Sequence, residues 1–150
     1  MSLAEEVELL RKIPLFANVE QSKLKLLAFT SERVVFNAGD ILFRQDEMGN
    51  AAYIIMDGEA EVIVNTPNGP LKVATVGRND FVGEIAILCD VPRTATIRAA
   101  TQLNTLCISK ELFFRLITEF PQMAVEIMRV LAQRLEKTTR QLREAVATKG

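Results

Sequence analysis

The sequence predicts a mainly β domain with flanking helices: an eight-stranded jelly-roll β-barrel, N-terminal helices and a long C-terminal helix. Between residues 31 and 108, short apolar runs alternate with turn residues about every eight to twelve positions, which is typical of barrels and sandwiches. On both sides of this region, apolar residues recur at the spacing of amphipathic helices. A chain of 150 residues is long enough for one core, so we expect a single domain over residues 1–150.

The first part of the chain, about residues 1–30, predicts two short helices at residues 4–12 and 20–29. The segment Ile13-Pro14-Leu15-Phe16 separates them, because a proline disfavours helical conformation at the residue before it.

Residues 31–108 supply the predicted strands. They are 34–36, 41–44, 53–56, 59–64, 71–76, 94–99 and 103–108, with turns at 37–40, 47–50, 66–70 and 77–80. Asp57-Gly58 stands between two β-rich runs and is typical of a tight hairpin. We therefore expect residues 59–64 to pair back on residues 53–56.

Residues 109–147 predict two C-terminal helices. Ser109 is a typical N-cap for the first, whose expected buried face is Leu112, Phe113, Leu116 and Ile117. Pro121 suits the first position of the second, which should run to about residue 147. Its residues Met128, Leu131, Leu135, Thr138 and Leu142 follow the spacing of a coiled-coil seam. The same spacing fits a helix that packs on its own barrel, so both interpretations stay open.

Composition excludes several classes of function. A net charge of −1 provides no clustered basic excess for nucleic acid, and no apolar run reaches the ~18–20 residues of a membrane span. Cys89 and Cys107 are too few for a disulfide framework, so a reducing cytoplasm is expected. The sequence contains no histidine, which removes Ser-His and Cys-His catalysis and every histidine-based metal site. We expect neither a catalytic nor a metal site.

Residues 81–96 carry the most informative polar pattern: a bend at Gly83, one short apolar helical turn, and a return into a strand. The N–H groups of Glu84, Ile85 and Ala86 would open that helix without intrahelical partners, and such groups bind phosphate. Arg93 can add a two-pronged contact to phosphate oxygens.

The other residues of this stretch suit a sugar beside the phosphate. The Glu84 carboxylate only accepts hydrogen bonds, so it fits a ribose hydroxyl. Gly83 lets a ligand approach the backbone, and the small Ala86 and Ala95 leave room for a bulky group. A purely structural explanation is also available, in which Arg93 is a surface salt-bridge partner of Glu84 worth under ~1 kcal/mol.

The full pattern favours a ligand site. Phe-Val-Gly-Glu-Ile-Ala-Ile-Leu at 81–88 and Pro-Arg-Thr-Ala-Thr-Ile-Arg-Ala at 92–99 closely resemble the phosphate-binding cassette of cyclic-nucleotide-binding domains. These are the domains of the bacterial catabolite-activator family, of cyclic-nucleotide-dependent protein kinases and of cyclic-nucleotide-gated channels. Residues 13–16, 53–62 and 134–139 resemble the entry segment, the central hairpin and the C-terminal helix of that family. The resemblance therefore covers almost the whole chain.

The resemblance implies roles by position. Glu84 would accept a hydrogen bond from the ribose 2′-hydroxyl, with Gly83 and Ala86 lining that end, and Arg93 would pair with the cyclic phosphate. Thr94 would lie near the phosphate and purine, where a hydroxyl suits contact with guanine in kinase-type domains, although many cAMP binders also carry one.

Four residues outside the cassette are implied as well. Val73 and Val76 would belong to an apolar wall. Thr138 and Thr139 fall where the catabolite-activator branch contacts the adenine amino group, one residue from each subunit. For these threonines a weak, solvated helix position is the alternative.

We therefore expect a non-catalytic sensor that binds a cyclic nucleotide, cAMP in preference to cGMP, and transmits occupancy through its C-terminal helix. Cyclic nucleotide is the expected partner, together with a homodimer through Met128, Leu131, Leu135 and Leu142. The alternatives are a sensor fragment of a larger transcription factor, channel or kinase-like protein, or an interaction module with a degenerate pocket. An enzyme of the cupin type is disfavoured, because such enzymes usually need a histidine-rich metal site.

Overall fold

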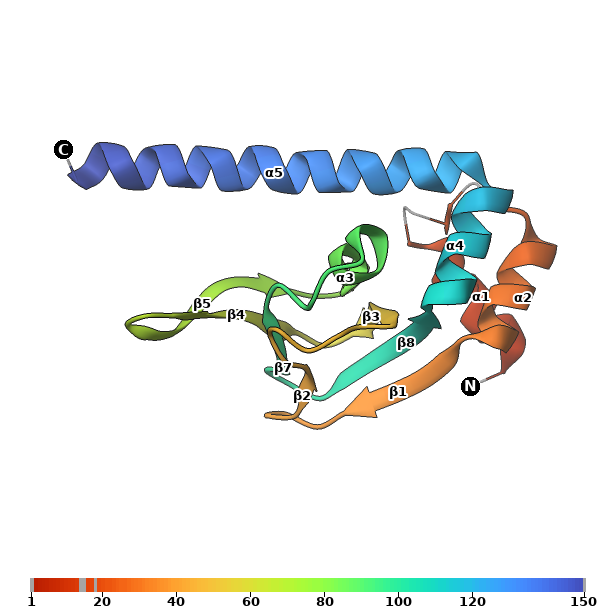
Figure 1. Cartoon of the computed structure of the whole chain (residues 1–150). Helices are drawn as coiled ribbons and strands as arrows, with labels where there is room; N and C mark the ends of the chain where they lie inside the picture. The colour runs from red at the N-terminus through yellow and green to blue at the C-terminus, as the bar shows by residue number, and fades with distance from the viewer. Residues whose placement is uncertain (1, 14–15, 18, 150) are drawn as a thin grey trace. The chain divides into compact units, whose positions relative to one another are not determined.

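The computed structural model describes residues 2–13, 16–17 and 19–149 (Figure 1). They divide into two compact units, one that ends at Phe114 and one that begins at Arg115. The elements in chain order are α1 (Leu3–Arg11), α2 (Gln21–Thr30), β1 (Glu32–Phe36), β2 (Ile41–Phe43), β3 (Ala51–Asp57), β4 (Ala60–Thr66), β5 (Gly69–Val76), β6 (Phe81–Val82), α3 (Glu84–Cys89), β7 (Thr96–Ala99), β8 (Leu103–Ser109), α4 (Lys110–Glu119) and α5 (Pro121–Lys149). Pro14 and Leu15, from the predicted entry segment, lie outside the described residues.

The strands form two four-stranded antiparallel sheets, with the orders β1-β8-β3-β6 and β2-β7-β4-β5. The predicted number of eight strands is confirmed, and β6 is the strand for which no range was predicted. Two packed sheets are consistent with a jelly roll, but the predicted β-barrel does not close. Among the described residues, no ladder joins one sheet to the other. A buried apolar cluster drawn from both sheets forms the core: Leu42, Ile55, Ala60, Val82, Ile97, Ala99 and Leu103. The two sheets therefore bury their inner faces against each other, as in a sandwich.

The predicted Asp57-Gly58 hairpin is also wrong. The chain does turn at Gly58, whose φ is 97°, but β3 pairs with β8 and β6 whereas β4 pairs with β5 and β7. A Cβ at Gly58 would lie 2.3 Å from the Gln102 carbonyl oxygen, and the Glu59 N–H donates to Thr101 Oγ1 at 3.1 Å. The turn is thus held against the β7–β8 connection and carries the chain from one sheet to the other.

Three other predicted turns are confirmed. Thr66 and Gly69 are register partners that close the β4–β5 hairpin. In the turns at 37–40 and 77–80, an aspartate side chain accepts the N–H of the first residue: Asp40 from Asn37 at 2.8 Å and Asp80 from Gly77 at 2.9 Å. These local bonds satisfy backbone groups that the strands leave unpaired.

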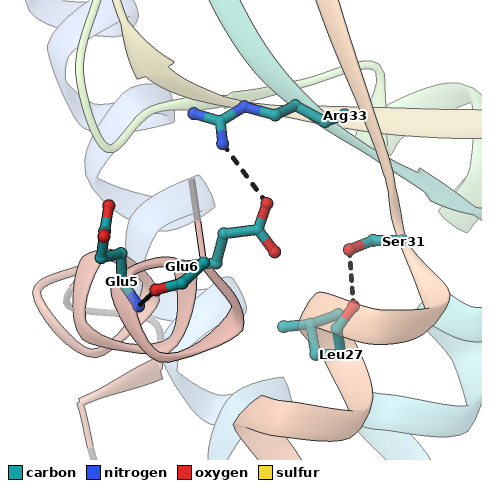
Figure 2. A network of polar contacts seen from close by, with 6 residues as sticks. Glu5, Glu6, Leu27, Ser31 and Arg33 are labelled. Carbon is teal, nitrogen blue, oxygen red and sulfur yellow. Dashed lines mark hydrogen bonds and ion pairs between the residues drawn. The ribbon is translucent and has the colours of Figure 1, made fainter.

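The N-terminal helices lie together near the start of β1 (Figure 1). Figure 2 shows the ion pair between α1 and β1, in which Arg33 Nη1 is 3.3 Å from Glu6 Oε1. Helix α2 ends where the Ser31 hydroxyl donates to the Leu27 carbonyl (Figure 2). The predicted helices are confirmed, each displaced by one residue.

The C-terminal helices also begin where predicted. Ser109 Oγ accepts the Leu112 N–H at 3.2 Å, which is the expected cap, and α5 starts at Pro121. Of the predicted buried face, Leu112, Phe113 and Leu116 are buried, whereas Ile117 is half-buried. Within α5, Met128, Leu135 and Leu142 of the predicted seam are 60%, 68% and 65% exposed, so dimerisation through them stays a prediction. In the part of the chain that the structure describes, no helix is both long and apolar enough to cross a membrane.

Replacing Gly58 by alanine tests the sheet-crossing turn. Gly39 is the matched control, since its φ is 92° and a Cβ there would have no neighbour within 4 Å. We expect Gly39→Ala to lower the free energy of unfolding by about 1–2 kcal/mol through backbone strain alone. Gly58→Ala should cost at least about 1 kcal/mol more, because its methyl group overlaps the Gln102 carbonyl. Urea denaturation measures both, and equal losses would contradict this account of the turn.

Candidate functional site

The backbone of residues 81–96 follows the predicted course. Gly83 lies between β6 and α3 with φ 87°, a left-handed conformation that glycine adopts without strain. A Cβ at this position would lie 2.5 Å from Arg93 Nη1 and 3.2 Å from the Ala51 carbonyl oxygen. Helix α3 ends at Asp90, which is also left-handed with φ 54°. The absence of a side chain at Gly83 therefore leaves the space that the Arg93 guanidinium fills.

The Arg93 side chain is buried and held by main-chain carbonyls. Its exposed fraction is 5%. Nη1 donates to the Gly83 carbonyl at 3.0 Å, and Nη2 donates to the Ala51 carbonyl at 2.8 Å. Nε is buried and has no hydrogen-bond partner among the described residues. One donor of a buried cation is thus unsatisfied, which is uncommon in protein interiors.

Aromatic side chains form one wall around this cation. Arg93 Cζ lies 4.0 Å from the centroid of the Phe43 ring. Phe43 stacks on Tyr53 with centroids 6.1 Å apart, and Tyr53 meets Phe36 edge to face at 6.0 Å. Burial lowers the pKa of Arg93, although the neighbouring Tyr53 acts in the opposite direction. A guanidinium has so high an ordinary pKa that it stays charged.

The backbone of Arg93 is fixed as firmly as its side chain. Its N–H donates to the Glu47 carbonyl at 2.8 Å, and its carbonyl accepts the Asp46 N–H at 2.8 Å. These bonds join the cassette to the β2–β3 connection. A Cβ at Gly49, in the same connection, would lie 2.4 Å from Arg93 Cζ and Nε. Sequence reasoning missed the roles of Phe43, Gly49 and Ala51. It predicted residues 41–44 as a strand and residues 47–50 as a turn, and nothing in the sequence linked them to Arg93.

Glu84 is the second charged residue of the site and is 3% exposed. It is the first residue of α3, where the positive end of the helix favours a carboxylate. Its charge is among those that raise the pKa of Arg93, so the two groups lie within electrostatic reach. The explanation of this pair as a surface salt bridge is wrong, because both side chains are buried. The arrangement offers a donor to an anion and an acceptor to a hydroxyl.

This geometry agrees with the comparison with known proteins. Residues 33–120, more than half of the chain, match the family model of the cyclic nucleotide-binding domain. The chain belongs to the cyclic nucleotide-binding domain family. The resemblance found in the cassette is thereby confirmed.

Relatives of this domain occur in regulatory proteins. The chain is 35% identical over 121 residues to a cAMP-dependent protein kinase regulatory subunit of Schizosaccharomyces pombe, covering 81% of this chain and 28% of that protein. It is 28% identical over 142 residues to a CRP-like cAMP-activated global transcriptional regulator of Mycobacterium tuberculosis, covering 94% and 63%. The structure of the Thermus thermophilus catabolite activator protein matches with a TM-score of 0.77 and 25% identity, over 86% of this chain and 61% of that one. The cyclic nucleotide-binding domain thus spans less than two thirds of each of these three chains.

The remaining predicted cassette residues of this cyclic nucleotide-binding domain differ in exposure. Ala86 is buried and Ala95 is half-buried, whereas Thr94 is exposed and Ile85 is 40% exposed. Their contacts with a ligand stay predictions.

The predicted residues outside the cassette lie on β5 and α5. Val73 falls at a β-bulge, where the register moves from Val62↔Ala74 to Ile63↔Lys72, and it is 48% exposed. Val76 packs against the core cluster. Thr138 and Thr139 are exposed on α5, in the second unit. The ligand contacts expected of these four residues stay predictions too.

Acidic and cysteine side chains do not gather into a metal-binding cluster within the described residues. No group of three or more Cys, Asp or Glu side chains in them could hold a metal ion.

The wall of the site can be tested through Tyr53, the one tyrosine of the sequence. Burial raises the pKa of Tyr53, and the neighbouring Cys107 raises it further. The tyrosinate absorbance of the native protein should therefore titrate above the ordinary value of about 10. Tyr53→Phe should lose the signal, which is the control.

The sign of the stability effect follows from the same shift. The pKa of Tyr53 is higher in the folded than in the unfolded protein. Its contribution to the free energy of unfolding is therefore fully present below about pH 10 and is lost as pH rises through the folded pKa. A native midpoint equal to that of free tyrosine would show that Tyr53 is not desolvated.

Proposed function

We propose that this chain is a non-catalytic sensor that binds a cyclic nucleotide, with cAMP favoured over cGMP, and transmits occupancy through its C-terminal helix. The proposal is carried by one observation: the buried Arg93 guanidinium has an Nε that lacks a hydrogen-bond partner among the described residues. A buried charge that its surroundings compensate only in part is destabilising, so an anion at Arg93 would be stabilising.

The two charges select the kind of anion. A 3′,5′-cyclic phosphate is a diester with one negative charge, and the same ribose keeps a free 2′-hydroxyl. Arg93 would donate to the phosphate, and Glu84 would accept from that hydroxyl. A phosphate monoester carries more negative charge at neutral pH, which the Glu84 carboxylate repels. A cyclic nucleotide therefore fits this pair better than an ordinary mononucleotide.

The preference for cAMP rests on two arguments. Two similar regulatory proteins are described as cAMP-dependent or cAMP-activated. In addition, the hydroxyls of Thr138 and Thr139 would meet the adenine amino group. Thr94 would lie near the phosphate and purine without distinguishing the two bases. Val73 and Val76 would contribute an apolar wall. Guanine offers a carbonyl where adenine has its amino group, so cGMP would lack that donor.

Transmission requires that the ligand bind one conformation better than another. We propose that the phosphate draws the cassette inward and that the final helix then closes over the purine. The chain would act as the sensor part of a larger regulator in the cytoplasm, and a homodimer would form through Met128, Leu131, Leu135 and Leu142. An interaction module with a degenerate pocket is the competing function.

Calorimetric titration with cAMP and with cGMP tests the binding. We expect the parent protein to bind cAMP more tightly than cGMP. Arg93→Ala should weaken cAMP binding by about 2–5 kcal/mol, the usual effect of removing one partner of a buried charge pair.

Arg98→Ala is the matched control, because Arg98 is exposed and pairs with Glu61 on β4 at 3.0 Å. It should leave affinity unchanged. Equal affinity of the Arg93→Ala and parent proteins would refute the site. Absence of binding by both nucleotides would favour the interaction module.

The dimer is tested separately on α5. Leu135→Glu places a charge in the proposed seam, and Gln133→Glu places the same charge two residues away on the same helix. We expect sedimentation to show a dimer for the parent and for Gln133→Glu, and a monomer for Leu135→Glu. The measurement is made with and without cAMP. A monomeric parent in both conditions would contradict the proposed seam.

A further inference from the structure

Two contacts of Arg93 are not used by the proposed function, although they determine where its guanidinium lies. The Phe43 ring is 4.0 Å from Cζ, and Gly49 approaches the same group from the β2–β3 connection. Neither residue offers a hydrogen bond to a nucleotide from its side chain. Both therefore act on Arg93 rather than on a ligand.

The distances from Gly49 to the Arg93 guanidinium show which part of that group Gly49 faces. An added Cβ would lie 2.4 Å from Cζ, 2.4 Å from Nε and 2.8 Å from Nη2 of Arg93. A point at nearly equal distances from these three atoms overlies the guanidinium plane rather than its edge. All three nearest atoms belong to Arg93, and the Phe43 ring contacts the same group with its centroid 4.0 Å from Cζ.

We propose that Phe43 and Gly49 are positioning residues, which hold the Arg93 guanidinium in the orientation that presents Nε–H to an anion. The inference rests on the proposed function, because the anion is taken to be the cyclic phosphate. The two Nη donors are bound to the carbonyls of Gly83 and Ala51, which fixes one edge of the group. The contacts with Phe43 and Gly49 fix its plane. With edge and plane fixed, Nε is the one guanidinium nitrogen that has no hydrogen-bond partner among the described residues, although each Nη also carries a second hydrogen.

Phe43 has a second effect on the same group. A cation over an aromatic face is stabilised electrostatically, and more strongly when it is desolvated. The ring can therefore compensate part of the desolvation of Arg93 without using any donor atom. A backbone carbonyl in its place would occupy Nε and compete with the ligand.

The test uses calorimetric titration with cAMP on four variants and the parent. Phe43→Leu removes the ring but keeps an apolar side chain, and Phe43→Tyr restores the ring. Gly49→Ala adds one methyl group over the guanidinium, at a position without positive φ. Gly77→Ala is its matched control, because Gly77 also lacks positive φ and its nearest neighbour would be 3.7 Å away.

We expect Phe43→Leu to lower the affinity for cAMP by about fivefold to thirtyfold, the range of a desolvated cation–π contact. Phe43→Tyr and Gly77→Ala should remain within about twofold of the parent. Gly49→Ala should weaken binding by at least about tenfold, because displacing the guanidinium should cost at least about 1.4 kcal/mol of binding free energy. Urea denaturation verifies that each variant is folded under the titration conditions.

A readout on Arg93 itself separates positioning from general destabilisation. The Nε–H resonance of Arg93 is assigned by its loss in Arg93→Lys. In the nucleotide-free protein it should move in Gly49→Ala and in Phe43→Leu, and remain in place in Gly77→Ala. In an Arg93→Lys background, Gly49→Ala should no longer lower the affinity, because lysine has no plane for the methyl group to displace.

Parent-like affinity and an unmoved Nε–H resonance in Gly49→Ala and Phe43→Leu would overturn the inference and leave the proposed function intact. An equal loss of affinity from Gly49→Ala in the parent and in the Arg93→Lys background would overturn it too, because the effect would then be structural. If the parent binds no cyclic nucleotide, the proposed function fails and this inference fails with it.

Discussion

The burial of one guanidinium is the constraint on which the rest of the site depends. Arg93 is 5% exposed, and a charge so placed is destabilising unless surrounding groups compensate it. The groups that do so come from separate stretches of chain. Gly83 and Ala51 supply carbonyls, and Phe43 supplies an aromatic face. The junction of β6 with α3, the start of β3 and the end of β2 are therefore held together by a single side chain.

The same segments also bond to the first residue of α4. The Lys110 N–H donates to the Asn50 carbonyl at 2.8 Å, directly before Ala51, and Lys110 Nζ lies 3.4 Å from Asp90 Oδ1 at the end of α3. The backbone hydrogen bond is the stronger of the two interactions, because the ion pair is exposed to solvent. The exposed fractions of the Lys110 and Asp90 side chains are 38% and 83%. The proposed transmission thus has a contiguous set of bonds from the anion site to the start of α4. Coupling through them requires that the two ends have different preferred arrangements with and without ligand.

The sequence predicts well those parts of the structure that are determined by residues close together in the chain. Ser109, Pro121 and the aspartate turns act on neighbouring residues, so capping and turn rules locate them. The Asp57-Gly58 pattern correctly predicts a turn, yet the strands after it pair elsewhere, because strand partners are chosen by long-range burial and by the contact of Gly58 with Gln102. Glu84 and Arg93 were found from their chemistry. Gly49 and Phe43 were missed, since a glycine needed by an arginine far along the chain looks like any turn glycine.

The way in which the charge of Arg93 is compensated determines which ligands the site can bind. Had an acidic side chain paired directly with the Nε of Arg93, the cation would be satisfied and an anion would gain little by binding. Main-chain carbonyls and an aromatic ring compensate the charge in part and leave one donor unpartnered among the described residues. Because the charge is only partly compensated, an anion that binds here also stabilises the folded state, by the linkage between binding and folding. Under the proposed function, the Glu84 carboxylate disfavours highly charged anions, because its repulsion grows with the negative charge of the ligand.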